Sequence, residues 1–120
     1  MQGISPSPAV WDTVRVPFPY TDRPVRQRRP ALVIAVPGVQ AQLRLLWVLM
    51  ITSADNRGWP GDVALTDLPA TGLPVPSLVR TEKVASIDVR DADWIGRLPE
   101  PERRAVTAQL RRHLAGAGWP

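Results

Sequence analysis

An arginine and a threonine stand at the ends of two apolar runs that follow one another along the chain. Arg29 comes just before the run 31–36, and Thr52 comes directly after the run 45–51. An arginine that enters one strand and a threonine that leaves its neighbour can lie beside each other at one end of a sheet. Together they offer a forked cation and a hydroxyl donor, which suit the charge that develops on a phosphodiester during cleavage. The pair therefore predicts a site that handles phosphate groups.

Both residues also have ordinary structural interpretations. Composition alone would make Arg29 a surface residue at a strand start, and threonine suits any strand end. Pro30 pushes the preceding arginine into extended backbone, which holds its side chain on a strand. Thr52 and Ser53 are adjacent and point to opposite faces of a strand, so only one of them can share a site with Arg29 unless the strand breaks there. Spacing does not decide between these two hydroxyls.

The densest positive charge lies in the loop between the first two expected strands. Four arginines fall within seven residues and follow two aromatic residues, and the set is Phe18, Tyr20, Arg23, Arg26, Arg28 and Arg29. Cations interleaved with aromatic rings are typical of proteins that bind single-stranded nucleic acid. In the alternative interpretation, Phe18 plugs one end of the fold and the arginines are solvated.

The composition favours a polyanionic partner and excludes several kinds of active site. The net charge is +4, the isoelectric point is near 11.0, and 14 of the 15 basic residues are arginines. Arginine-rich composition also follows from GC-rich coding sequence, so placement carries more weight than number. The chain has no cysteine and one histidine, His113, which excludes disulfides, thiolate nucleophiles and two-histidine metal sites. The chemistry must use arginine, hydroxyls and carboxylates, and we expect no cofactor and no metal.

Short apolar segments separated by proline and glycine predict a mainly β fold that ends in one helix. The expected strands are 10–16, 31–36, 45–52, 62–65, 77–80, 83–88 and 95–98. From Glu102 onward, Val106, Leu110 and Leu114 recur every fourth residue, which predicts an amphipathic C-terminal helix. We therefore expect a small, strongly bent sheet or barrel with one C-terminal helix.

The length of 120 residues suits one domain with one core. We expect a flexible N-terminal arm over residues 1–9 and a single domain over 10–120. The longest apolar run, 45–51, is far shorter than the ~20 residues of a membrane span, so we expect a cytoplasmic protein without membrane contact. Within this run Trp47 is predicted to lie in the core, and Trp94 is predicted to pack against its neighbours.

A series of motifs occurs in order at residues 14–22 (VRVPFPYTD), 28–34 (RRPALVI), 51–53 (ITS), 72–73 (GL), 76–80 (PSLVR) and 95–98 (IGRL). This ordered set resembles the MazF/PemK family of type II toxin-antitoxin toxins. Each motif alone is weak, but their order over about residues 10 to 115 is specific. The chain departs from the family at Trp11-Asp12, where relatives commonly have Gly-Asp. Either the entry turn differs there or Trp11 covers an edge.

The resemblance implies a compact SH3-like barrel of the CcdB/PemK type, a symmetric homodimer, and a ribosome-independent, metal-independent endoribonuclease. The family's arginine before proline falls on Arg29 and its threonine at the end of the central strand falls on Thr52, so these are the expected catalytic residues. In the family reaction, the ribose 2′-hydroxyl attacks the adjacent phosphate of single-stranded RNA and leaves a 2′,3′-cyclic phosphate and a 5′-hydroxyl. The expected RNA-binding residues are Tyr20, Arg26, Arg28, Ser53, Arg57, Ser77 and Arg80. The expected protein partner is a small antitoxin with a disordered, acidic and apolar segment.

The sequence does not assign the general base of this reaction. Arginine remains protonated in ordinary surroundings, so Arg29 could act as a base only in an unusual environment. Glu82 is a possible acid-base partner, although a solvated surface glutamate is the commoner situation. We expect His113, near the apolar stripe of the C-terminal helix, to be structural.

Two alternatives keep the fold without the nuclease activity. The first is a CcdB-like toxin that binds DNA gyrase, for which the tail Gly118-Trp119-Pro120 would be a docking peg. The second is a catalytically silent family member that only binds an antitoxin. In both cases the purified protein would leave RNA intact.

Overall fold

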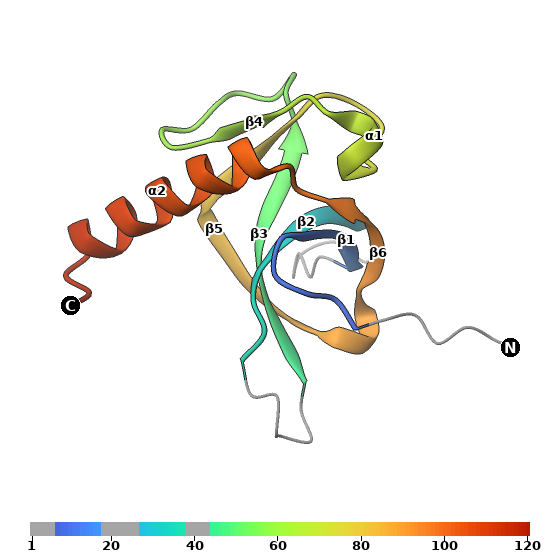
Figure 1. Ribbon diagram of the computed structural model, residues 1–120, viewed down its shortest axis with the longest axis horizontal. Helices are drawn as coiled ribbons and strands as arrows, with labels where there is room; N and C mark the ends of the chain where they lie inside the picture. Colours follow the sequence, from blue (N-terminus) through green and yellow to red (C-terminus); the bar gives the residue numbers. More distant parts are fainter. Residues whose placement is uncertain (1–6, 18–26, 38–43) are drawn as a thin grey trace, which may run out of the picture.

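The computed structural model describes residues 7–17, 27–37 and 44–120. They form a six-stranded antiparallel sheet with the strand order β4-β5-β3-β2-β1-β6. The sheet curls into a half-barrel, and the C-terminal helix lies against β4 and β5 (Figure 1). The strands are β1 (Asp12–Pro17), β2 (Arg28–Ala35), β3 (Leu45–Ser53), β4 (Val63–Leu65), β5 (Ser77–Asp88) and β6 (Asp93–Arg97). The helices are α1 (Leu68–Thr71), the 3-10 turn η1 (Val89–Asp91) and α2 (Glu100–Gly116).

The expected mainly β fold with a C-terminal helix is confirmed, and three elements differ in detail. The expected strands 77–80 and 83–88 form one strand, β5, because the chain bends between them without leaving the sheet. Helix α2 begins two residues earlier than expected, since Pro101 is tolerated in a first turn. The short helix α1 was not expected, and the Asp67 carboxylate caps it by accepting a hydrogen bond from the Ala70 amide at 3.1 Å.

Alternating residues of the central strands build a hydrophobic cluster on each face of the sheet. Val33 and Val48 belong to one cluster, which includes no residue of α2. Leu32 and Leu49 belong to the cluster on the other face, which includes Val106 of α2. All five side chains have no exposed surface. The central strands are therefore buried on both faces, as their continuous apolar sequences predict.

The prediction that Trp47 lies in the core was wrong, and Trp94, which was predicted to pack against its neighbours, is also largely exposed. The Trp47 side chain is 47% exposed and that of Trp94 is 56% exposed. Trp47 lies on the face of β3 opposite to its buried neighbours Leu46 and Val48, where the described part of the chain does not cover it. Trp94 lies on β6, which is an edge strand of the sheet.

Several predictions concern residues outside the described part of the chain. They include most of the expected N-terminal arm, and the aromatic and basic residues Phe18, Tyr20, Arg23 and Arg26. Among the described residues, no helix has the length and apolar character needed to cross a membrane.

Candidate active site

Arg29 and Thr52 lie at the same end of the sheet because β2 and β3 run antiparallel. Ala31 pairs with Met50 and Leu32 pairs with Leu49. If this register is continued by two residues, Arg29 stands opposite Thr52. This is the end of β3 that points toward β4 and α1 (Figure 1). Both residues line one pocket, so the structure brings the two expected catalytic residues together.

The pocket is small and rich in positive charge, and we call it the cationic pocket. Its volume is about 210 Å³, below the ~300–1,000 Å³ of most small-molecule sites. Such a volume suits a phosphate and its sugar, with the bases lying on the rim. The residues that line it are Arg29, Met50, Ile51, Thr52, Trp59, Arg80 and Lys83. This lining includes no carboxylate and no imidazole.

Asn56 orients the Thr52 hydroxyl. Its side-chain amide donates a hydrogen bond of 2.6 Å to Thr52 Oγ1. Since the hydroxyl oxygen accepts this bond, its own hydrogen can be donated to a ligand. Arg29 is positioned in part by Gln27, whose Oε1 accepts a hydrogen bond of 3.2 Å from Arg29 Nη2. Sequence reasoning missed Asn56, which lies in the turn after β3.

A bend in β5 sends neighbouring residues to two different sites. The register of β5 against β3 shifts so that Met50 alone stands opposite the four residues 80–83. The first and last of these four, Arg80 and Lys83, line the cationic pocket. The two between them line a second site beside α2. The bend therefore places two further cations, Arg80 and Lys83, in the pocket that Arg29 and Thr52 line.

The Arg80 guanidinium is held by three contacts within the protein. Its Nη1 lies 3.0 Å from Asp62 Oδ2, and both side chains are at most 10% exposed. Its Nη2 donates a hydrogen bond of 2.9 Å to the Arg57 carbonyl. The guanidinium carbon also lies 4.2 Å from the centre of the Trp59 ring, a cation–π contact. Arg80 was expected to bind RNA, and two of its five N–H donors bind groups within the protein in the hydrogen bonds given above.

The segment Trp59-Pro60-Gly61-Asp62 forms a type II turn that fixes Trp59 at the rim of the pocket. The Asp62 amide donates a hydrogen bond of 3.1 Å to the Trp59 carbonyl. In return the Trp59 amide donates one of 2.8 Å to Asp62 Oδ2. Proline at the second position and Gly61 at φ +87° at the third are the residues this turn requires. The sequence carried this signal, and it could have identified Trp59 and Asp62 as ordered residues.

Four other expected RNA-binding residues do not line the cationic pocket. Arg28 points away from it and forms an ion pair of 2.6 Å with Asp93. The Ser53 hydroxyl accepts a hydrogen bond from the Asp55 amide at 3.2 Å, and the buried Ser77 hydroxyl donates one of 2.8 Å to the Val75 carbonyl. Arg57 contributes its backbone carbonyl to Arg80, and the residue is otherwise exposed.

Glu82 lies with His113 beside α2 and not at the cationic pocket. Its Oε1 is 3.7 Å from His113 Nδ1. Thr81 Oγ1 donates a hydrogen bond of 2.7 Å to the Gly61 carbonyl and lies 2.8 Å from His113 Nε2. Because the hydroxyl hydrogen is used by Gly61, His113 Nε2 must carry the hydrogen of the second bond. These contacts link α2 to β5 and to the turn that carries Trp59.

An apolar groove of about 650 Å³ lies between α2 and the sheet. Its lining residues are Ile34, Trp47, Thr81, Glu82, Val84, Leu110, His113, Leu114, Gly116 and Ala117. Three large apolar side chains in it are strongly exposed: Trp47 at 47%, Val84 at 56% and Leu114 at 48%. Such a group of exposed side chains is typical of surfaces that meet another protein.

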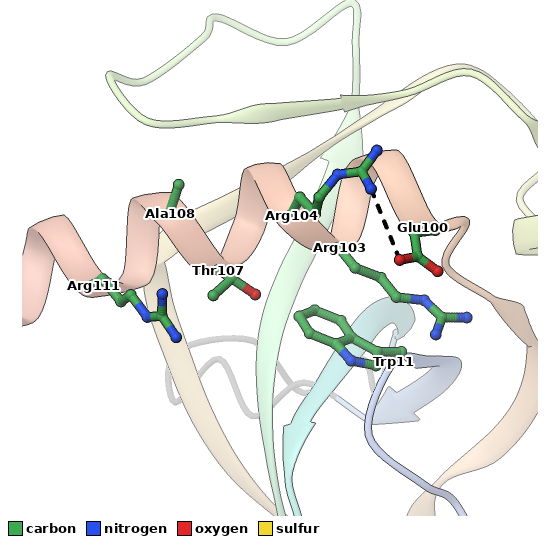
Figure 2. Close-up of a pocket in the computed structure, with 7 residues that line it drawn as sticks. All are labelled: Trp11, Glu100, Arg103, Arg104, Thr107, Ala108 and Arg111. Carbon is green, nitrogen blue, oxygen red and sulfur yellow. Dashed lines mark ion pairs between the residues drawn. The ribbon is translucent and has the colours of Figure 1, made fainter.

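A third depression, of about 430 Å³, lies beside the first half of α2. Figure 2 shows the Trp11 indole below the helix, next to Arg103. Trp11 has φ +79°, a left-handed conformation that glycine adopts readily. Its amide donates to the Val33 carbonyl and its carbonyl accepts from the Leu98 amide, both at 2.8 Å. Trp11 thus occupies a backbone position that glycine adopts readily, and its indole lies against the underside of the helix.

A family model and solved structures match most of this chain. The model, described as PemK-like, MazF-like toxin of type II toxin-antitoxin system, matches residues 10–114. A crystal structure of MazF from Deinococcus radiodurans is 26% identical, with 92% of this chain and 99% of that chain covered and a TM-score of 0.71. A search of curated proteins found no significant match.

Two structures of toxins with antitoxins have the same fold. A MazE–MazF complex from Deinococcus radiodurans is 23% identical, covers 97% of this chain and 100% of that chain, and has a TM-score of 0.68. An endoribonuclease in complex with its cognate antitoxin, from a mycobacterial species, is 17% identical, covers 94% and 99%, and has a TM-score of 0.69. At these identities the likeness concerns the fold.

Proposed function

Because the chain belongs to the PemK-like, MazF-like toxins of type II toxin-antitoxin systems, we propose that it is an endoribonuclease that cleaves single-stranded RNA at specific sequences. The observation that carries this proposal is the convergence of Arg29 and Thr52 on one cationic pocket. A guanidinium and a free hydroxyl hydrogen can both donate to the phosphoryl oxygens of a bound phosphodiester.

In the proposed reaction the nucleophile belongs to the substrate. The ribose 2′-oxygen attacks the adjacent phosphorus and gives its proton to solvent, while the bond from phosphorus to the 5′-oxygen breaks and this oxygen takes up a proton from solvent. The products are a 2′,3′-cyclic phosphate and a 5′-hydroxyl. The protein needs to orient the phosphate and stabilise the extra negative charge of the transition state. Arg29 supplies a forked pair of donors and Thr52, oriented by Asn56, supplies one more.

Proton transfer is not assigned to Glu82. Its carboxylate lies beside His113, on the side of β5 away from the residues that line the cationic pocket. We therefore give Glu82 and His113 a role in packing α2 and in supporting the Trp59 turn.

The proposed enzyme is a homodimer whose interface includes the apolar groove. The exposed side chains of Trp47, Val84 and Leu114 support this location, because a second copy would remove them from water. Light scattering should give twice the monomer mass for the purified protein. Val84→Asp should shift the mass to the monomer, while Arg90→Ala, at an exposed position of η1, should not. A wild-type monomer at micromolar concentration would contradict the proposal.

The proposed protein partner is an antitoxin with an acidic and apolar segment. The net charge of +4 and the cationic pocket favour an acidic partner. The affinity should fall as salt rises, because screening weakens contacts between exposed charges. A dissociation constant that is indifferent to ionic strength would contradict a mainly electrostatic contact.

The deciding experiment is incubation of purified protein with a long single-stranded RNA in EDTA, followed by mapping of the new ends. We expect cuts at a short recurring sequence with 5′-hydroxyl ends, and we expect Arg29→Ala and Thr52→Ala to slow them by about 10²–10³-fold while remaining folded. Intact RNA across many sequences would contradict the nuclease proposal.

An exposed C-terminal tryptophan favours one alternative outcome. The Trp119 side chain is 68% exposed at the end of the chain, which fits a peg that docks on another protein, as in a gyrase-binding toxin. Intact RNA together with a stable gyrase complex would support that function. Intact RNA with antitoxin binding alone would indicate a silent family member.

A further inference from the structure

Trp59 is the aromatic residue that lines the cationic pocket. Its side chain remains 43% exposed even though its surroundings are ordered. Because the pocket volume of about 210 Å³ suits a phosphate and a sugar, the base attached to that sugar must find its contacts on the rim. Trp59 is placed where such a contact is needed.

The structure fixes the orientation of this ring before any ligand arrives. The Arg80 guanidinium stacks on the ring, with its central carbon 4.2 Å from the ring centre. The Asp62 carboxylate links the guanidinium to the backbone of Trp59. Its Oδ2 accepts hydrogen bonds from both Arg80 Nη1 at 3.0 Å and the Trp59 amide at 2.8 Å. A large side chain held in one orientation loses little conformational entropy when it binds a ligand.

The buried ion pair also changes what Arg80 can do. Its charge is balanced by Asp62, and both side chains are at most 10% exposed. An arginine in this position supports the ring more readily than it binds a phosphate by itself. Arg80 was expected to be an RNA-binding residue, and its contacts favour a supporting role.

We propose that Trp59 stacks on a base of the RNA next to the phosphate held by Arg29 and Thr52, and that Arg80 and Asp62 are positioning residues for this ring. The proposal rests on the proposed nuclease function and adds a base-binding residue to it. Stacking on tryptophan is worth about 1–3 kcal/mol for each base, which corresponds to roughly 5–150-fold in affinity.

The test compares variants on an RNA that cannot be cleaved. The probe spans the cleavage sequence mapped for the wild type, with 2′-deoxyribose at the scissile nucleotide, so the attacking hydroxyl is missing. Trp59→Ala should raise its dissociation constant by roughly 5–150-fold, and Trp59→Phe should restore most of the affinity. Trp94→Ala, an exposed tryptophan on edge strand β6, is the matched control and should bind as the wild type does.

A second set of probes separates stacking from a structural role. Each probe carries an abasic site at one nucleotide near the scissile bond. At the stacked position, the abasic RNA should bind the wild type and Trp59→Ala equally, because the partner of the ring is missing. Equal effects of Trp59→Ala on every probe, or no effect on any, would overturn the proposal. If the wild type cleaves RNA while Trp59→Ala binds normally, the stacking role alone fails; if the wild type neither cleaves nor binds RNA, both proposals fail.

Discussion

The cationic pocket and the apolar groove are both lined by residues of β5, but they differ in how firmly the protein holds their side chains. The pocket receives Arg80 and Lys83 from the bend of β5, and the groove receives the two residues between them. In the pocket, Arg80 already has an internal counter-charge and Trp59 already has a fixed orientation. In the groove, large apolar side chains remain exposed. The side chains of the pocket are thus held in place within the chain, whereas those of the groove are left exposed to water by the described residues.

The largest expected effect concerns the buried ion pair that organises the pocket. Asp62→Ala leaves the Arg80 charge buried without its carboxylate, so we expect a loss of about 3–5 kcal/mol in the free energy of unfolding. Urea denaturation measures this loss. Asp93→Ala, which removes the exposed partner of Arg28, is the matched control and should cost less than ~1 kcal/mol. Equal losses in the two variants would contradict the contrast between buried and exposed pairs.

Arg29→Ala should reduce the cleavage rate by about 10²–10³-fold, the range seen when one donor to transition-state charge is removed. Arg29→Lys keeps the charge but loses the forked geometry, so its cleavage rate should lie between those of the wild type and Arg29→Ala. Single-turnover cleavage of RNA measures both rates. A lysine variant as fast as the wild type would show that charge alone is sufficient.

Asn56→Ala removes the hydrogen bond that orients the Thr52 hydroxyl. A hydrogen bond of this kind contributes about 0.5–1.5 kcal/mol, so the cleavage rate should fall by up to about tenfold. The double variant with Thr52→Ala should be no slower than Thr52→Ala alone, because Asn56 acts through that hydroxyl. Additive effects in the two variants would give Asn56 a separate role.

His113→Ala should have the smallest effect on cleavage, because His113 lies in the groove and not in the pocket. We expect a rate close to that of the wild type, with a stability loss of about 1 kcal/mol from the lost bond to Thr81. Thermal unfolding and cleavage assays on the same preparation measure both quantities. Abolished cleavage in a folded variant would assign His113 to the chemistry.

Sequence reasoning predicted the fold class and the meeting of Arg29 with Thr52, because both follow from two long apolar runs in antiparallel order. It did not predict the internal role of Arg80, since the carboxylate that holds it is 18 positions away and only the folded chain brings them together. The exposure of Trp47 was also missed. An apolar run indicates burial on both faces, but Trp47 lines the groove and is left 47% exposed by the described part of the chain.

The order of the strands also has a consequence for when the toxin can assemble during synthesis. β1 lies between β2 and β6 in the sheet. One edge of β1 therefore stays unpaired until β6, the last strand in sequence order, has been synthesised. The ion pair between Asp12 and Arg97 spans 85 positions, and contacts of such long range form slowly. The sheet therefore cannot be completed before β6, the last of its six strands in sequence order, has been synthesised.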